Sequence, residues 1–263
     1  MKKIFALLLA VMMMATVFSA CGLQDTVVIG YTIYDPMNYI DENGDLVGFD
    51  TELAKAVFEK IGYAASFKLI GWEQKYTELN AGTIDCIWNG FTANTADDDG
   101  VARSEKVDFS YNYMRNKQVV VTTAELAATV TDAASLAGKV GAVEASSAGA
   151  TFLEETLTDA IKKGVTSQLD AMRDLAMKTA DFVVVDEQLA KAYVGTGDYK
   201  DLVIVQTVTG TEEFYAIGFK KESELTAKVN KALEELAADG TIAALAEKYG
   251  VSNTIITDFS DQK

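Results

Sequence analysis

The sequence predicts an α/β fold in which mostly parallel sheets are flanked by helices. Short β-branched runs alternate with amphipathic segments of about 10 to 15 residues, the spacing of helical crossovers between parallel strands. The 263 residues are enough for one large domain or two smaller ones. Because 49% of them are hydrophobic and 24% are charged, the composition is that of a globular chain and not of a disordered one.

The first elements show how the pattern assigns strands and helices. Residues 27–30 consist of three β-branched apolar residues followed by Gly30, which predicts a short buried strand. Asp50 can cap a helix with Leu53 and Val57 on one face, and Gly62 ends it. Similar patterns predict strands at 65–70, 85–88, 117–121, 139–143, 182–185, 202–208 and 215–219. Further helices are expected at 73–79, 149–160, 167–177, 222–238 and 241–249.

The N-terminal 20 residues have the features of a secretion signal. Lys2 and Lys3 precede an apolar run at 4–18 that is shorter than the roughly 20 residues needed to span a membrane. Small residues lead to Cys21, as in bacterial lipoprotein signals, although Phe18 stands where those signals usually have Leu. We therefore expect a signal peptide at 1–20 and lipidation of Cys21, which would anchor an extracytoplasmic protein to the cytoplasmic membrane. The alternative is a buried N-terminal helix with a chance cysteine.

Several classes of function are disfavoured by composition. A net charge of -16 opposes nucleic-acid binding, and the absence of His excludes His-dependent catalytic triads and HExxH zinc sites. No nucleotide-binding loop is present, and no cofactor is expected. The spacing of acidic residues at 41–52 is similar to a calcium loop, but Leu46 stands where the sharp bend needs Gly. A turn followed by a helix cap is preferred there, and a solvated loop at 97–99, so no metal site is expected.

A binding cleft has more support, because polar and aromatic residues follow the predicted strands. In open α/β sheets, ligands bind where strands end. Ser146 and Ser147 can cap a helix and direct backbone N–H groups at an anion, whereas Asp186 ends the strand 182–185 and could face a cation. Aromatic residues at similar places are Tyr34, Trp72, Trp88, Phe91 and Tyr113. Each serine and Asp186 could alone be an ordinary helix cap, but together they match the two charged groups of an amino acid.

Longer stretches make the interpretation specific. The chain resembles the family 3 solute-binding proteins, of periplasmic-binding-protein type II, that serve bacterial ABC importers of polar amino acids. Segments similar to that family's signatures lie at 39–50, 82–92, 107–110, 139–141 and 183–187. The resemblance implies an α/β fold of two lobes joined by two hinge crossings. Lobe 1 would comprise 24–115 plus 213–256, lobe 2 would comprise 116–212, and 257–263 would form a tail.

The resemblance also implies which positions contact the ligand. Arg103, Ser146 and Ser147 would hold the α-carboxylate, and Asp186 would hold the α-ammonium. Extra residues at about 96–102 precede Arg103, so the alternative is that Arg103 is a solvated partner of Asp97 to Asp99. The ten implied ligand-binding residues are Tyr34, Trp72, Asn89, Gly90, Phe91, Thr92, Arg103, Ser146, Ser147 and Asp186.

The implied function is that of an extracytoplasmic receptor, not an enzyme. It would capture a polar amino acid by hinge closure and deliver it, as a monomer, to the transmembrane subunits of an ABC permease. Many relatives have an acidic residue where this chain has Tyr31, and often a polar one where it has Val143. A neutral polar ligand such as glutamine, or cystine, is therefore a hypothesis. The alternatives are a secreted dehydratase-like enzyme of the same fold and a ligand-sensing domain.

Overall fold

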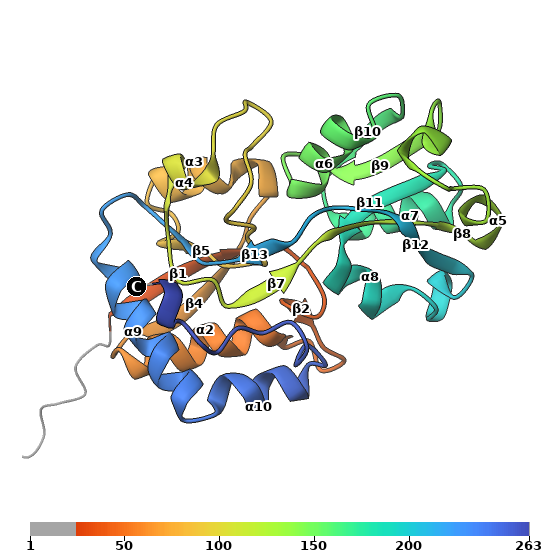
Figure 1. Cartoon of the computed structure of the whole chain (residues 1–263). Helices are drawn as coiled ribbons and strands as arrows, with labels where there is room; N and C mark the ends of the chain where they lie inside the picture. The colour runs from red at the N-terminus through yellow and green to blue at the C-terminus, as the bar shows by residue number, and fades with distance from the viewer. Residues whose placement is uncertain (1–24, 263) are drawn as a thin grey trace, which may run out of the picture.

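The computed structural model describes residues 25–262 and consists of two α/β lobes (Figure 1). Each lobe is built on a five-stranded sheet flanked by helices. The predicted signal peptide and Cys21 lie outside the described residues. Within residues 25–262, no helix is both long enough and apolar enough to cross a membrane.

The sheet of the first lobe has the order β4-β1-β5-β14-β6. Alternation along the first strand explains its two-sided burial, because Val27 and Ile29 pack with the core under the long helices whereas Val28 faces the opposite layer. The strands of the lobe are β1 (Thr26–Tyr31), β2 (Tyr39–Ile40), β3 (Leu46–Val47), β4 (Ala64–Leu69), β5 (Cys86–Ile87), β6 (Asp108–Phe109) and β14 (Gly218–Phe219). Its helices are α2 (Phe49–Lys60), η1 (Trp72–Gln74), α3 (Lys75–Asn80), α4 (Arg103–Lys106), α9 (Glu224–Ala238), α10 (Thr241–Lys248) and η4 (Ser260–Gln262).

The sheet of the second lobe has the order β10-β9-β11-β8-β12. Its central strand β11 is buried throughout, since helices cover both of its faces. The strands are β8 (Gln118–Thr123), β9 (Val140–Glu144), β10 (Ile161–Val165), β11 (Phe182–Asp186) and β12 (Leu202–Thr209). The helices are α5 (Ala124–Ala127), η2 (Ala133–Leu136), α6 (Ala148–Thr156), α7 (Gln168–Ala176), α8 (Glu187–Tyr193) and η3 (Gly197–Tyr199).

Two short antiparallel strands connect the lobes, β7 (Met114–Asn116) and β13 (Glu213–Tyr215) (Figure 1). They carry the chain into and out of the second lobe, so the strands that follow β7 and precede β13 run in opposite directions. Accordingly β8 pairs antiparallel with both β11 and β12, and β14 pairs antiparallel with β5 and β6. In each five-stranded sheet four strands therefore run in the same direction and one, β14 or β8, runs against them, so the expectation of mostly parallel sheets is confirmed.

Two details differ from the sequence expectations. Strand β10 was not predicted, because Lys162 and Lys163 interrupt its apolar pattern; an edge strand tolerates them, since one side of it faces solvent. The segment from residue 257 to Gln262 packs against the first lobe and is not the free tail expected from the sequence. The buried Phe259 ring stacks on Tyr111, with ring centroids 5.5 Å apart, and the Gln262 side chain accepts a hydrogen bond from the Asn112 backbone.

Candidate functional site

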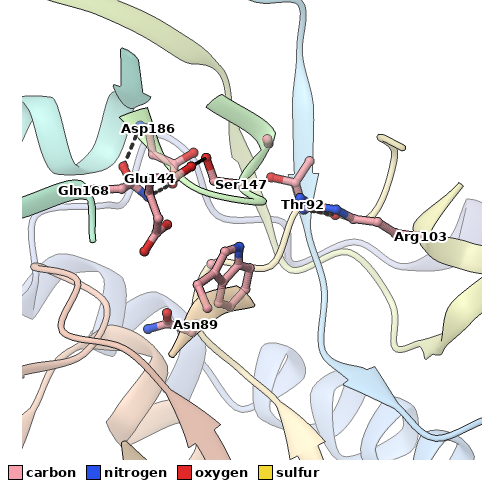
Figure 2. A pocket seen from close by; sticks show the side chains of 10 residues that line it. Asn89, Thr92, Arg103, Glu144, Ser147, Gln168 and Asp186 are labelled. Atoms are coloured by element: carbon pink, nitrogen blue, oxygen red, sulfur yellow. Dashed lines mark hydrogen bonds between the residues drawn. The ribbon is translucent and has the colours of Figure 1, made fainter. Parts of the chain in front are cut away.

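A polar cavity lies between the lobes, at the carboxyl ends of strands β5, β9 and β11 (Figure 2). Parallel strands that end at one edge of a sheet bring their following loops together, and ligands bind there in open α/β sheets. The cavity measures about 20 Å³, room for about one water molecule. It is lined by Trp72, Asn89, Gly90, Thr92, Arg103, Glu144, Ser147, Ala148, Gln168 and Asp186.

The Asn89-Gly90 segment is held in place by hydrogen bonds from beneath the cavity. The Asn89 side-chain amide donates to the Thr32 carbonyl at 2.9 Å and to Asn38 Oδ1 at 2.7 Å. The Gly90 N–H donates to the Asp50 carboxylate at 2.8 Å, and burial raises the pKa of Asp50 to about 7. The first lobe therefore presents this strand end in one fixed conformation.

Substituting Gly90 by alanine is expected to destabilise the fold. Gly90 has φ +58°, and a Cβ atom there would lie 2.5 Å from Tyr34 Cε1 and 3.1 Å from a Tyr215 ring carbon. The two tyrosine hydroxyls are hydrogen-bonded at 2.6 Å, so neither ring can move freely. Strain and overpacking together should lower the free energy of unfolding by about 2 kcal/mol or more, seen as a melting midpoint lower by roughly 4–8 °C.

The matched control is Gly62→Ala. Gly62 also has positive φ, but a Cβ atom there would meet no atom within 4 Å. Gly62→Ala introduces backbone strain but no steric overlap, so its melting midpoint should fall by clearly less than that of Gly90→Ala. An equal loss in the two variants would show that the tyrosine contacts do not constrain Gly90.

Arg103 reaches the cavity despite the extra residues before it. The insertion closes on itself, because Ala96 pairs with Ala102 and the Arg103 N–H donates to the Thr95 carbonyl. The Arg103 side chain is 1% exposed. Its Nε donates to Asp97 at 2.8 Å and its Nη1 to the Thr92 carbonyl at 3.1 Å.

The buried Nη2 of Arg103 has no hydrogen-bond partner among residues 25–262. The Phe91 ring lies against the guanidinium, with Cζ 5.1 Å from the ring centroid. Arg103 is thus bound to Asp97, as one interpretation of the sequence held, but it is buried and not solvated. Its remaining N–H donors are available to an anion in the cavity.

On the second lobe, Asp186 offers a buried carboxylate. It is the last residue of β11 and its side chain does not cap α8. Its Oδ1 accepts hydrogen bonds from Asn116 and Gln118, each at 2.6 Å, and its Oδ2 accepts one from Gln168 at 2.5 Å. Burial raises the pKa of Asp186, whereas these donors lower it. Ser147 caps helix α6 by accepting a hydrogen bond from the Ala150 N–H at 3.1 Å.

The lobes also touch through side chains beside the cavity. The buried Lys75 ammonium donates to the Ser146 carbonyl at 3.0 Å and lies 4.9 Å from the centroid of the Trp72 ring. Burial, together with the charge of Arg103, lowers the pKa of Lys75 to about 8. The Ser146 hydroxyl also donates a hydrogen bond of 3.3 Å to the carboxylate of Asp98, which lies in the inserted loop. In this structure the two lobes are therefore in direct contact beside the cavity.

Seven of the ten residues proposed from the sequence line the cavity, and three do not. Tyr34 lies beneath Gly90 with its hydroxyl bonded to Tyr215. Phe91 packs into the apolar core of its lobe below Arg103. Ser146 has φ +56°, its carbonyl accepts from Lys75, and its hydroxyl faces the inserted loop.

Three lining residues were not among the ten ligand-binding residues proposed from the sequence: Glu144, Ala148 and Gln168. Glu144 is the last residue of β9, so the rule that ligands bind at strand ends could have found it. Gln168 is the first residue of helix α7 and is separated from the end of strand β10 by two residues. Because strand β10 was not predicted, Gln168 was not recognised as a residue that follows a strand.

Comparison with known proteins gives consistent results. The sequence profile of the bacterial extracellular solute-binding proteins, family 3, matches residues 27–252. The arginine-binding extracellular protein ArtP of Bacillus subtilis (strain 168) is 26% identical over 260 residues, which are 95% of this chain and 98% of ArtP. The L-cystine-binding protein TcyA of the same organism is 27% identical over 218 residues, covering 82% of this chain and 77% of TcyA.

A solved structure is similar over most of the chain. It is an ABC uptake transporter substrate-binding protein from Streptococcus pneumoniae with bound histidine, 32% identical with a TM-score of 0.75. The match covers 85% of this chain and 92% of that one. The two-lobed fold implied by the sequence resemblance is confirmed.

Proposed function

The chain belongs to family 3 of the bacterial extracellular solute-binding proteins, and from this we propose that it captures a free amino acid between its lobes and delivers it to an ABC permease. The observation that supports this proposal is the pair of opposite charges at the cavity. Arg103 of the first lobe has unused N–H donors, and Asp186 of the second lobe offers a carboxylate. An α-carboxylate and an α-ammonium are the complementary groups.

The aromatic and polar lining supports the same ligand class. Trp72 lies along the cavity, where an aromatic face near an ammonium contributes about 0.5–2 kcal/mol. Thr92 and Ser147 place further polar groups beside Arg103 and Asp186 (Figure 2). Two similar proteins are named for binding arginine and cystine, and a third has histidine bound; each of these ligands is a polar amino acid.

Capture requires the lobes to move. The cavity of about 20 Å³ is far below the roughly 300 Å³ or more of typical ligand sites. A ligand can enter only when the lobes part about the crossings at β7 and β13. Because the two charged contacts come from different lobes, binding free energy is gained fully only on closure, which favours the closed form. Recognition of that form by the permease, and tethering through lipidated Cys21, belong to the same proposal.

Thermal unfolding with added amino acids tests the proposal. The purified protein is unfolded and refolded to remove carried ligand, then heated with each common amino acid and with cystine. A ligand at 100 times its Kd stabilises the native state by about 2.7 kcal/mol, a rise of roughly 5–11 °C in the melting midpoint of a chain of this size. A flat response to all amino acids would contradict the proposal.

The dehydratase alternative makes a different prediction for the bound ligand. A receptor returns its ligand unchanged, whereas an enzyme of this fold would convert it. Release of the bound amino acid by denaturation, followed by chromatography and mass spectrometry, distinguishes the two. Recovery of a product with lost water would move the assignment to an enzyme.

A further inference from the structure

One carboxylate of the cavity has no counterpart in the recognition described above. The α-carboxylate and α-ammonium of a ligand account for Arg103 and Asp186. Glu144 also lines the cavity, on the same lobe as Asp186. A cavity that closes over one ligand ammonium therefore still contains an extra buried carboxyl group.

Glu144 is placed to meet the ligand and not to support the fold. It is 4% exposed, and Figure 2 shows its side chain extending into the cavity on the side of Asn89, away from Asp186. Its backbone carbonyl accepts a hydrogen bond from the Ser147 hydroxyl at 2.7 Å. Its carboxylate, by contrast, has no hydrogen bond and no ion pair within 4.0 Å in the part of the chain that the structure describes.

The cations near Glu144 are already engaged elsewhere. Arg103 is bonded to Asp97 and to the Thr92 carbonyl, and Lys75 donates to the Ser146 carbonyl. Burial, and then the negative charge of Asp186, raises the pKa of Glu144 to about 8, although Lys75 and Arg103 oppose this. A buried carboxylate without a close partner is costly. The closed site therefore favours a ligand that brings its own cation to this position.

The same geometry revises two sequence arguments for a neutral pocket. Side chains alternate along a strand, so in β9 Val143 and Glu144 face opposite ways. Val143 is fully buried in the apolar core of the second lobe, and Glu144 faces the ligand site. Tyr31 is edge-on to Phe67, with ring centroids 6.2 Å apart, and does not line the cavity. Neither Val143 nor Tyr31 therefore reports on the charge of the site.

We propose that Glu144 pairs with a cationic group at the end of the ligand side chain, so that the protein prefers arginine, ornithine or lysine over neutral amino acids. The inference rests on the proposed amino-acid binding and names its substrate class. Glu144 acts as a specificity determinant, whereas Arg103 and Asp186 bind groups that all amino acids share. Glutamine, which has the same α-groups but an uncharged end, is the neutral competitor.

Calorimetric titration with arginine and citrulline tests the inference. Citrulline has the length and shape of arginine, but an uncharged urea replaces the guanidinium. The unmodified protein is expected to bind arginine at least about tenfold more tightly than citrulline, the size of one charge-assisted contact. In Glu144→Gln the two affinities should come within about threefold, through loss of arginine affinity. Glu125→Gln, an exposed change of the same kind on the second lobe, should keep the preference.

The outcomes separate this inference from the proposed function. Citrulline, glutamine or cystine binding as tightly as arginine and lysine would overturn the role of Glu144 and leave amino-acid binding intact. So would a Glu144→Gln variant that keeps the arginine preference. Binding of no amino acid at all would instead contradict the proposed function. Because the arginine-to-citrulline ratio is measured on the unmodified protein, the test does not depend on the folding of the variant.

Discussion

Replacing Arg103 by lysine is expected to weaken amino-acid binding by about 100-fold, the effect of losing one or two charge-assisted hydrogen bonds. The guanidinium serves three directions at once: Asp97, the Thr92 carbonyl and the cavity. A lysine side chain ends in a single ammonium and lacks the planar fork of the guanidinium, so it cannot contact all three of these groups at once. The fold should tolerate the change, because Lys106 also binds Asp97, at 2.9 Å, and keeps that buried carboxylate paired.

The measurement for Arg103→Lys is titration of the ligand identified by thermal unfolding. Arg173→Lys is the matched control, since Arg173 is exposed on α7 and paired with Asp170. The control should bind as the unmodified protein does. An Arg103→Lys variant with unchanged Kd and an unchanged melting midpoint would show that Arg103 pairs only with the inserted loop and does not bind the ligand.

Replacing Asp186 by asparagine is expected to reduce affinity by on the order of 100-fold or more, because one member of a buried charge pair is removed. The cause is twofold. The α-ammonium loses its counter-charge, and the new side-chain NH₂ group faces the donors of Asn116 and Gln118 or that of Gln168. In the ligand-free protein the mismatched donor is destabilising, whereas loss of a buried charge whose pKa burial raises is stabilising. Because these two effects oppose each other, the melting midpoint without ligand should change little.

Calorimetry and thermal unfolding, with and without ligand, separate these effects for Asp186→Asn. The expected pattern is a nearly unchanged midpoint without ligand and a lost ligand-induced rise. Asp201→Asn is the control, since Asp201 is exposed on the same lobe. Retention of the ligand-induced rise in Asp186→Asn would place the α-ammonium elsewhere in the cavity.

Much of the fold and part of the site could be predicted from the sequence. Patterns with a short period carry that information. Alternating apolar residues and helix caps lie within a few positions of one another, so the strand at 182–185 and the helix at 222–238 were predicted without the structure, which has them at 182–186 and 224–238. Residues directly after strands, such as Asn89, Gly90 and Asp186, were found because topology places strand ends together.

The positions of individual side chains at the cavity required the tertiary structure. The inserted loop at 96–102 folds back on itself, so that sequence distance no longer predicts where Arg103 lies. Tyr34, Phe91 and Ser146 occupy strand-end positions, but neighbouring elements take up their side chains.

The sequence by itself therefore determined the α/β class, the family and the strand ends at which a ligand site forms. Tertiary structure alone decided which side chains meet there. Glu144 and Gln168 line the cavity, the first by the register of β9 and the second through the edge strand β10 that its lysines concealed. The physical reason is that a strand end sets the place of a residue, whereas packing from distant segments sets the direction of its side chain.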